Sequence, residues 1–525
     1  MGDNRFSRRY FFYGSLLAGA VPAGGFGSTP SLPALGFKSY NQKLNIAAIG
    51  VGTRGPEILR GAAVTENIVA LCDVNEEKAA RAFATYPNAS KHKDFRKMLD
   101  TEGKNIDAVM VATPDHMHTP AALLCMQHGK HVYCEKPLTR TVWEAQFLAD
   151  AAAKYKVATQ MGNQGFNHEG TKTACEILWS GDIGEVREVH AWTGSIYGGQ
   201  PNIPATGPES QPVPATLDWD LWQGPAATRN FNALMVNQWR AFIDFSTGGS
   251  LGDWIVHVLG PAHLALELYK AAPISVENVT VEGKNEWVWP LKAHTVYEFP
   301  ARANMPPVTI HVYQNMRGDF KNPPGMAENE RLFPASDNLA ERGRAFVGDQ
   351  ILRRGGPPAG AFGGAGRPGG GTGPNAAGTG RRGPGGQGGP GRPGGMAEGA
   401  DAAQRAPGNG AVFVGSKGYM ATTSRGEGVW LLPASRWADY KLPPQLLPRG
   451  VNHQQDWIRA CKGGTPGVSE FSVATKYIEW LVLGTIALRV PGKLMWDSKN
   501  MRFTNNEEAS KYVKPYLRKG WALKL

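Results

Sequence analysis

Short apolar runs alternate with helical segments over the first third of the chain. Leu44–Ile49 is almost wholly apolar, as expected for a strand buried on both faces. Similar runs recur at 68–72, 106–113, 131–134 and 157–161. The segments between them that have helical character include 76–86, 121–128 and 144–155. This alternation predicts an α/β fold built on a doubly wound parallel sheet.

Glycine and polar residues collect where the predicted strands end. The carboxyl ends of parallel strands meet along one edge of a sheet, and ligands bind beyond that edge. The segments concerned are Gly50, Asp73, Thr113–His118, Glu135–Pro137 and Gly162–Gln164. We therefore expect them to form a single binding site.

The first strand runs into the glycine pattern Gly50-x-Gly52-x-x-Gly55. In a dinucleotide site these glycines permit a tight turn, close approach to the pyrophosphate and close helix packing. The N-terminus of the helix that follows attracts phosphate. Asp73 ends the second strand about 20 residues after Gly52, where an acid bonds the ribose hydroxyls. Asp73 favours NAD over NADP because it repels a 2′-phosphate, although Arg54 in the glycine turn could hold that phosphate.

The remaining chain has a different pattern. Strand-like alternation at 186–192, 293–299 and 308–313 indicates an open sheet. Two helices are predicted near the end, at 454–461 and 473–488. The second is apolar but too short to span a membrane, so we expect it in a core.

Composition changes between about 320 and 410. Residues 351–400 are rich in Gly, Pro, Arg and Ala and have almost no large apolar side chains, so they cannot bury a core. A collagen-like segment is excluded because glycine does not recur at every third position. We predict a disordered surface insertion in a C-terminal α+β domain at 163–525. The dinucleotide-binding domain takes 44–162.

The formal net charge of +11 over 525 residues invites a nucleic-acid interpretation. Six of the arginines, and no acid, lie between Ile351 and Ala397 in the predicted insertion. The rest is mildly basic and has no Lys/Arg stripe interleaved with aromatic residues, so nucleic-acid binding is not expected. Five cysteines show neither metal-ligand spacing nor a disulfide framework, which indicates buried free thiols.

Two adjacent arginines, Arg8 and Arg9, precede a short apolar run at 13–21. This is the pattern of a Tat export signal, and the run is too short to remain as a stable membrane span. We expect residues 1–43 to be the signal and a linker, read by the Tat machinery, with the protein in the periplasm or outside the cell. Tat transports folded proteins, which suits a cofactor loaded in the cytoplasm.

Three more motifs accompany the glycine pattern: Ala112-Thr-Pro-x-x-x-His118, Glu135-Lys-Pro137 and, after paired glycines, Asp253-x-x-x-His257. In this order they resemble the Gfo/Idh/MocA oxidoreductases, whose namesakes are glucose–fructose oxidoreductase and inositol dehydrogenase. The resemblance covers the chain from about Leu44 onward, without the insertion. It implies a mostly antiparallel second sheet that carries the substrate pocket against the nicotinamide. It also implies homo-oligomers through the open face of that sheet.

The resemblance and the strand-end positions together assign the cofactor site. Its residues are Gly50, Gly52, Thr53, Arg54, Gly55, Asp73, Thr113, Pro114, His116, His118, Glu135, Lys136, Asn163 and Gln164. His116 and His118 line the cofactor in this interpretation. No third ligand accompanies them, so no metal site is expected.

Hydride transfer from a carbinol carbon needs a base for the hydroxyl proton and a cation near the developing alkoxide. Lys136 can donate a proton and stabilise that charge, whereas His257 is the better acid or base near neutral pH. On a helix, a spacing of four puts Asp253 and His257 on one face, where Asp253 could bind a substrate hydroxyl. The resemblance implies the same catalytic roles. The alternatives are a structural salt bridge for Lys136 and a buried core histidine for His257.

Substrate contacts are the least determined part of the sequence. Trp192, Tyr197 and Trp239 could stack on sugar faces, and Arg240 is a further candidate. Packing in a core or a loop explains each aromatic residue equally well when it is taken singly.

These patterns lead to an exported NAD-dependent oxidoreductase that acts on a sugar, glycoside or polyol hydroxyl. Free NAD is scarce outside the cytoplasm, so the cofactor would be held tightly and regenerated within the site. The runner-up is an NAD-dependent glycoside hydrolase, in which transient oxidation precedes elimination, hydration and re-reduction. A third interpretation is a cofactor-bound sensor or scaffold, against which the intact Lys136, Asp253 and His257 argue.

Overall fold

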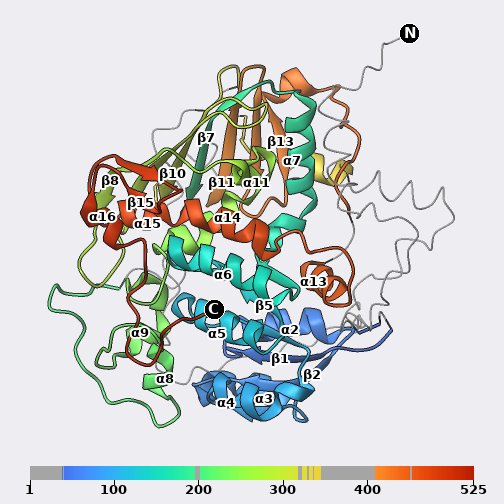
Figure 1. The fold of residues 1–525 in the computed structure, drawn as a ribbon. Helices are drawn as coiled ribbons and strands as arrows, with labels where there is room; N and C mark the ends of the chain where they lie inside the picture. Colours follow the sequence, from blue (N-terminus) through green and yellow to red (C-terminus); the bar gives the residue numbers. More distant parts are fainter. Residues whose placement is uncertain are drawn as a thin grey trace, which may run out of the picture.

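The chain folds into two β-sheets with helices packed on them, the first low and the second high in Figure 1. The computed structural model describes residues 38–39, 41–194, 201–316, 322–327, 330–334, 336–343, 408–449 and 452–525. The twin-arginine segment, Tyr197 and most of the predicted insertion lie outside the described residues.

The first sheet has the strand order β3-β2-β1-β4-β5-β6, and every neighbouring pair is parallel. Its strands are β1 (Asn45–Ile49), β2 (Asn67–Cys72), β3 (Ser90–His92), β4 (Ala108–Val111), β5 (His131–Glu135) and β6 (Thr159–Gly162). Its helices are α2 (Gly55–Ala63), α3 (Glu76–Thr85), α4 (Phe95–Glu102), α5 (His118–Gln127) and α6 (Val142–Tyr155). The apolar side chains of β4 and of nearly all of β1 are buried between these helices. The predicted doubly wound parallel sheet is confirmed.

Polar caps start three of these helices. The Asn75 side chain accepts the Lys78 N–H at 2.9 Å, and the Asp94 side chain accepts the Arg96 N–H at 3.0 Å. Thr141 begins α6 with a reciprocal capping box. Each cap satisfies a backbone N–H that has no partner inside the helix and contributes about 1 kcal/mol. The caps fix where the chain turns back from the strand ends.

The second sheet has the order β13-β12-β11-β7-β10-β9-β8-β14-β15, and only the β7–β10 pair is parallel. Its strands are β7 (Val186–Thr193), β8 (Ser275–Glu282), β9 (Lys292–Phe299), β10 (Val308–Gln314), β11 (Asn409–Gly415), β12 (Tyr419–Thr423), β13 (Val429–Leu432), β14 (Leu494–Asp497) and β15 (Arg502–Phe503). The implied large, mostly antiparallel sheet is confirmed.

The helices outside the first sheet come from distant parts of the sequence. They include α7 (Glu169–Ser180), α8 (Trp219–Gln223), α9 (Ala233–Asn237), α10 (Val256–Val258), α11 (Gly260–Ala265), α13 (His453–Cys461), α14 (Phe471–Leu481), α15 (Leu483–Ala487) and α16 (Glu507–Lys511). The apolar helix predicted at 473–488 is divided at Val482 into α14 and α15. Along the part of the chain that the structure describes, no helix combines the length and the apolar character needed to cross a membrane.

Alternation along β9 gives the second sheet one buried face. Tyr297 and Phe299 point into the core, where their ring centroids lie 5.2 and 5.3 Å from that of Trp480 in α14. His294 is partly exposed, whereas the residues before and after it in the strand are buried, so it points to the opposite face. The core therefore fills the space between this sheet and α14.

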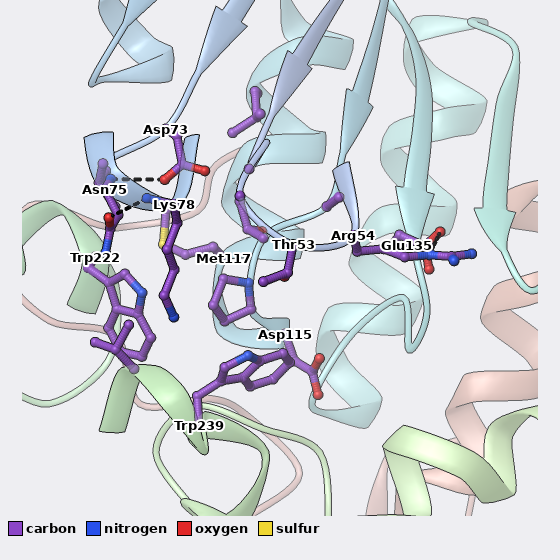
Figure 2. Close-up of a pocket in the computed structure, with 18 of the residues that line it drawn as sticks. Thr53, Arg54, Asp73, Asn75, Lys78, Asp115, Met117, Glu135, Trp222 and Trp239 are labelled. Atoms are coloured by element: carbon purple, nitrogen blue, oxygen red, sulfur yellow. Dashed lines mark hydrogen bonds and ion pairs between the residues drawn. The ribbon is translucent and has the colours of Figure 1, made fainter. Parts of the chain in front are cut away.

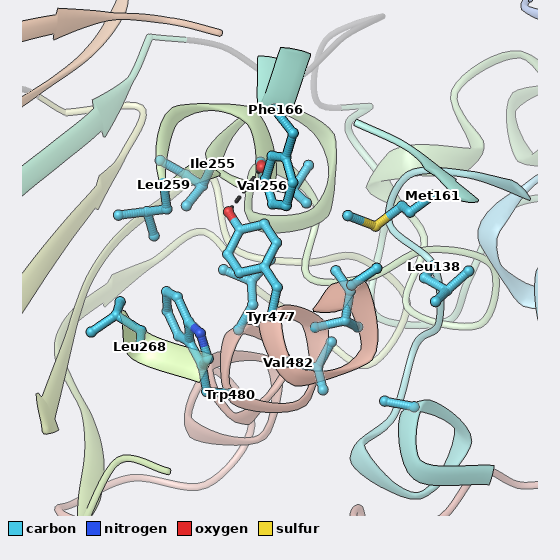
Figure 3. Packing of buried hydrophobic residues seen from close by; sticks show 14 of the residues in the cluster. Leu138, Met161, Phe166, Ile255, Val256, Leu259, Leu268, Tyr477, Trp480 and Val482 are labelled. Atoms are coloured by element: carbon cyan, nitrogen blue, oxygen red, sulfur yellow. Dashed lines mark hydrogen bonds between the residues drawn. The ribbon is translucent and has the colours of Figure 1, made fainter. Parts of the chain in front are cut away.

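The core also anchors the segment that carries Asp253 and His257. Tyr477 of α14 donates its hydroxyl to the Val256 carbonyl at 2.8 Å, and its ring lies 5.8 Å from that of Phe166 (Figure 3). All three of these residues are almost fully buried. A rigid core thus holds the backbone next to His257.

Helix α13 completes the core of the first sheet, although it lies about 300 residues further along the chain. It packs on α2, and Trp457 is fully buried in the same cluster as the apolar side chains of β1. After the helix, Lys462 pairs with Glu66 at 2.7 Å with both side chains nearly inaccessible to solvent. The two predicted domains therefore share one core at this point.

Candidate cofactor and catalytic site

A cavity of about 400 Å³ lies beyond the carboxyl ends of the first sheet (Figure 2). It is bordered by strand-end residues on one side and by residues from 221–257 on the other. The sequence-predicted residues that line it are Gly50, Gly52, Thr53, Arg54, Asp73, Thr113, Pro114, Glu135, Lys136, Trp239, Arg240, Asp253 and His257. Four of the five predicted strand-end segments therefore contribute to the lining, whereas Gly162–Gln164 does not.

Two glycine positions of the turn leave no room for a Cβ atom. Gly50 has φ +83°, and a Cβ there would lie 2.7 Å from the Ala112 carbonyl carbon. A Cβ on Gly55 would collide with the Gly50 carbonyl oxygen. Helix α2 begins at Gly55, so its unpaired N–H groups face the cavity end of the sheet. This turn has the form that pyrophosphate binding requires.

Asp73 is held rigidly at the end of β2. One carboxylate oxygen accepts the Val51 N–H at 2.8 Å and the other accepts the Asn75 N–H at 2.9 Å (Figure 2). Burial raises the pKa of Asp73, and these backbone hydrogen bonds oppose that rise. The Gly52 N–H bonds the same carboxylate, so three of its roughly four acceptor sites are used and one remains for a ribose hydroxyl.

Arg54 does not point toward Asp73. Its guanidinium forms ion pairs with Glu57 and, at 3.2 Å, with Glu135, on the far side of the glycine turn in Figure 2. The charge that could have held a 2′-phosphate is thus directed elsewhere, which leaves NAD as the better fit at Asp73.

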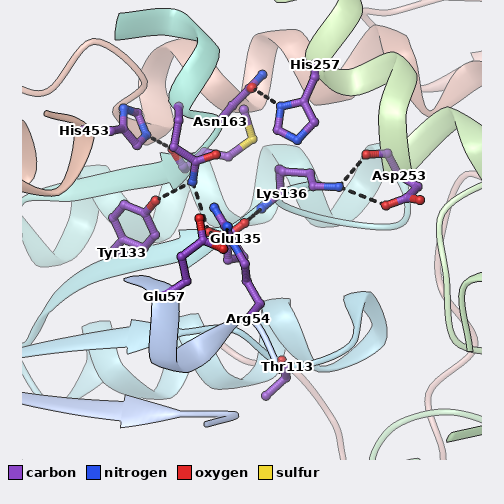
Figure 4. A network of polar contacts seen from close by, with 12 residues as sticks. Arg54, Glu57, Thr113, Tyr133, Glu135, Lys136, Asn163, Asp253, His257 and His453 are labelled. Carbon is purple, nitrogen blue, oxygen red and sulfur yellow. Dashed lines mark hydrogen bonds and ion pairs between the residues drawn. The ribbon is translucent and has the colours of Figure 1, made fainter. Parts of the chain in front are cut away.

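Lys136 and Asp253 form a buried ion pair at the centre of the cavity wall. Lys136 Nζ lies 2.5 Å from the Asp253 carbonyl oxygen and 3.2 Å from its carboxylate (Figure 4). Burial lowers the pKa of Lys136, and the Asp253 charge partly opposes this. Arg240 pairs with the same carboxylate at 2.9 Å. Two cations thus share one anion where a substrate oxygen can approach.

The surroundings of His257 fix its tautomer. The Val256 carbonyl can only accept a hydrogen bond, and the Asn163 side-chain N–H₂ donates to it at 2.9 Å. The oxygen of the same amide therefore faces His257. That oxygen lies 2.8 Å from His257 Nδ1, which must therefore carry the proton (Figure 4). Nε2 is left with a lone pair. Burial first, then the nearby Lys136 charge, lower the pKa of His257 well below 6.5, so the ring is neutral at pH 7.

Asp253 and His257 reach the cavity through an unusual turn. Residues Leu251–Ile255 form a π-helical turn that leads into α10, and both side chains line the cavity. The expectation of one shared face holds, although the turn is wider than the α-helix on which the spacing argument rests.

Four predicted cofactor residues lie behind the cavity wall. His118 bridges the carbonyls of Thr113 and Pro137 at 2.9 and 2.7 Å and so ties two strand-end loops together. Gln164 donates to Glu135 at 3.2 Å. His116 is enclosed by aromatic rings, and burial lowers its pKa to about 3. With Asn163, these residues support the lining rather than form it.

Of the substrate candidates, Trp239 and Arg240 line the cavity and are stacked, with the guanidinium carbon 4.1 Å from the ring centre. Trp192 does not line it. That side chain is 3% exposed and packs near Phe333, in a separate cluster on the second sheet. No metal-binding group of three or more His, Cys, Asp or Glu exists among the described residues. All five cysteines are buried and free, as predicted.

Sequence reasoning missed several lining residues, namely Asp115, Met117, Trp222, Trp254, Arg425 and Trp521. Asp115 and Met117 lie in a predicted strand-end segment, and their position was a usable signal. Trp254 lies inside the motif Asp253-x-x-x-His257, which was also a usable signal. Trp222, Arg425 and Trp521 reach the cavity from distant segments, so nothing in their local pattern places them there.

Residues 214–245, here called the cover segment, lie against the first sheet next to the cavity. Backbone hydrogen bonds join Glu76 N–H to the Thr216 carbonyl and Asp218 N–H to the Val74 carbonyl, both at 2.9 Å. Arg518 holds the segment from the C-terminal side through Asp220 at 2.5 Å. Trp222 and Trp239 of this segment face the cavity (Figure 2). The cover segment therefore forms one boundary of the cavity.

A parallel sheet with this order, a glycine turn after β1 and an acid at the end of β2 define a dinucleotide-binding Rossmann domain. Residues 44–163 match the family model described as "Oxidoreductase family, NAD-binding Rossmann fold", and residues 196–296 match its C-terminal alpha/beta domain. Residues 44–163 and 196–296 thus match both domains of the Gfo/Idh/MocA oxidoreductase family, whose first domain binds NAD.

Curated relatives match only part of their length. A glycosyl hydrolase family 109 protein from Saccharopolyspora erythraea is 35% identical over 180 residues, 29% of this chain and 38% of that protein. A levoglucosan dehydrogenase from Pseudarthrobacter phenanthrenivorans is 27% identical over 176 residues, 31% of this chain and 44% of that protein. The match thus spans about two fifths of these relatives.

A solved oxidoreductase from Thermotoga maritima has the same fold. Its TM-score is 0.50 at 14% identity, and the match covers 86% of this chain and 98% of that one. At this identity the likeness concerns the fold alone.

Proposed function

We propose that the protein is an exported NAD-dependent oxidoreductase that moves a hydride between tightly held NAD and a carbon bearing a hydroxyl in a sugar, glycoside or polyol. One observation carries the proposal. Lys136, Asp253 and His257 line the same cavity as the glycine turn and Asp73, and Lys136 and Asp253 are in direct contact there.

The residues fit a bound dinucleotide. The glycine turn is closely packed on its own backbone at Gly50 and Gly55, the form that a pyrophosphate site requires, and Asp73 has acceptor capacity to spare. The Thr113 hydroxyl, at the rim of the cavity, is buried without a hydrogen-bond partner in the described parts of the chain. Gly50, Gly52 and Asp73 would hold the cofactor, which supplies the hydride acceptor or donor when bound.

The protein's own groups manage the proton. His257 Nε2 carries a lone pair at neutral pH and can take the proton from the reacting hydroxyl. The Lys136 ammonium stabilises the negative charge that develops on the same oxygen. Asp253 orients Lys136 and can accept a hydrogen bond from a second substrate hydroxyl. Because these groups are already fixed by the core, little reorganisation is needed during the reaction.

Tight retention and export support one another in this proposal. The cover segment and Arg518 bound the cavity, which slows release of a ligand lying beneath them. A retained cofactor would make activity possible where free NAD is scarce. The twin arginines at 8 and 9 favour Tat export and a periplasmic or extracellular location.

A second candidate is an NAD-dependent glycoside hydrolase. It is favoured by the likeness to a family 109 glycosyl hydrolase. Transient oxidation of the sugar would acidify the neighbouring C–H and allow the aglycone to leave, so the same Lys136, Asp253 and His257 would serve. Release of the aglycone from an aryl glycoside without net NADH formation would distinguish this activity.

The nucleotide content of the purified protein tests the cofactor part. Denaturation without added cofactor should release close to one equivalent of NAD(H), identified by mass and absorbance. Asp73→Ala should retain about ten- to a hundredfold less, because a hydrogen bond to a charged group contributes roughly 1.5–3 kcal/mol. Asp150→Ala, on the exposed side of α6, is the control. An empty wild-type site, or equal occupancy in Asp73→Ala, would contradict the proposed retention.

Asn163→Ala should slow hydride transfer about tenfold to a hundredfold without releasing NAD, because the oriented base becomes free to change tautomer and rotate. Nitrogen-15 NMR of labelled histidine should show His257 protonated at Nδ1 in the wild type and a tautomer mixture in the variant. Asn67→Ala, at an exposed site, is the control. Loss of NAD from Asn163→Ala with an unchanged His257 tautomer would make Asn163 a cofactor contact instead.

A further inference from the structure

Arg425 brings a cation to the cavity from the second sheet. It lies in the turn between β12 and β13, and its side chain is part of the lining. The guanidinium carbon is 5.2 Å from the centre of the Trp254 ring, and that ring is 5.9 Å from His257. Its charge is close enough to contribute to the lowered pKa of His257. Arg425 therefore stands at the catalytic end of the cavity.

The guanidinium of Arg425 has no acidic partner in the described residues, and its Nε is buried without any hydrogen bond there. The other cations of this wall are paired. Lys136 and Arg240 share Asp253, and Arg54 is bound by Glu135 and Glu57. Leaving a buried donor of a charged group unsatisfied is costly, so such a group in a native structure calls for a partner. A ligand of the cavity can provide it.

The turn that presents Arg425 is built to hold it in place. The Arg425 N–H donates to the Glu427 carboxylate at 2.8 Å, and its carbonyl accepts from His168 Nδ1 at 3.0 Å. Gly165 passes so near that a Cβ there would lie 2.6 Å from the Arg425 carbonyl oxygen. Gly426 follows with φ +71°, a conformation that suits glycine. The side chain is thus directed by a fixed backbone and is not a freely mobile surface arginine.

The charges at this end of the cavity favour an anion. The cations that line it are Arg54, Lys136, Arg240 and Arg425, and the carboxylates beside them are Glu135, Asp253 and Asp115, of which Glu135 is paired with Arg54. Asp253 is already engaged by two cations, and Asp115 accepts the Thr247 N–H at 2.9 Å. The unpaired charge is therefore that of Arg425, and it is positive.

We propose that Arg425 binds the carboxylate of an acidic sugar, so that the substrate class is a uronic acid or its glycoside. A guanidinium can donate two parallel N–H hydrogen bonds to the two oxygens of a carboxylate. Trp254, over whose ring the Arg425 guanidinium lies, lines the cavity beside it. The inference rests on the proposed function, since it names the substrate class of the same site.

Binding of matched sugar pairs tests this assignment. The probes are methyl glucoside against methyl glucuronide and methyl galactoside against methyl galacturonide, titrated into the NAD-loaded protein by calorimetry. In at least one pair the acid should bind the wild type about tenfold tighter or more, with a preference that weakens as salt rises. Arg425→Met should remove the preference, and Arg425→Lys should keep part of it. Arg436→Met, an exposed arginine beside Trp437, is the matched control.

The results separate this inference from the hydride-transfer proposal. Equal binding of both members of each pair by the wild type, or a preference that survives Arg425→Met, overturns the assignment. Loss of NAD from Arg425→Met at an unchanged melting temperature overturns it too, because Arg425 would then hold the cofactor. A wild type that prefers the acids but never reduces its bound NAD supports the role of Arg425 and refutes the proposed reaction.

Discussion

Replacing Lys136 with alanine should reduce hydride transfer by about a thousandfold or more and leave bound NAD in place. Lys136 acts on the reacting oxygen, where removal of a single charge-stabilising donor costs about 10²–10³ in rate and loss of proton transfer adds to it. It lies at a different strand end from the glycine turn and Asp73, which would hold the cofactor in the same cavity. The rate is measured as NADH absorbance after substrate is mixed with the loaded protein.

Two comparisons make this result specific. Lys154→Ala removes an exposed lysine of α6 and should leave the rate unchanged. Lys136→Arg keeps the charge but changes its shape, so the rate should recover only in part. Unaltered turnover in Lys136→Ala, or loss of NAD in proportion to the lost activity, would remove Lys136 from its proposed role.

The second large effect concerns stability. Arg449→Met should lower the free energy of unfolding by about 3–5 kcal/mol, the usual cost of leaving buried charges without their partner. Arg449 pairs with Glu169 at 2.7 Å and Glu176 at 2.6 Å, and all three side chains are at most 9% exposed. Thermal unfolding should show a melting temperature lower by roughly 3–5 °C, because the unfolding entropy of a chain of this length is about 1 kcal/mol/K.

An exposed ion pair provides the contrast for Arg449. Arg187 and Glu185 are paired at 2.8 Å, but both are more than half exposed. Arg187→Met should therefore change stability by no more than about 1 kcal/mol. If the two variants unfolded at the same temperature, burial of the Arg449 pair would not be the source of its importance.

The cofactor half of the site could be predicted because its causes are local. The apolar run at Leu44–Ile49 and the glycines after it form the strand and turn by their own composition. Parallel strands then bring their ends to one edge of the sheet, so the presence of Asp73 and Lys136 in one cavity could be predicted without any knowledge of tertiary contacts. The catalytic pair Asp253 and His257 was accessible through its motif, although the π-helical turn beneath it was not.

The substrate half could not be predicted in the same way. Arg425 reaches the cavity because its turn rests on Gly165, a contact between residues 260 positions apart. Asn163 illustrates the same difficulty on a smaller scale. Its position at a strand end suggested the cofactor, but the Val256 carbonyl turns its amide toward His257. Such roles depend on which backbone packs where, and the periodicity of a sequence does not contain that information.

The sharing of one core between α13 and β1 has a consequence for how the protein is made. The ribosome must synthesise Trp457 before the apolar cluster around β1 is complete, and Lys462 before Glu66 can form its ion pair. A nascent chain that ends near residue 163 has its parallel strands but not this final layer. The nucleotide domain therefore matures late in translation, together with the rest of the molecule, and a fragment cut at the boundary between the two halves would expose part of its interior.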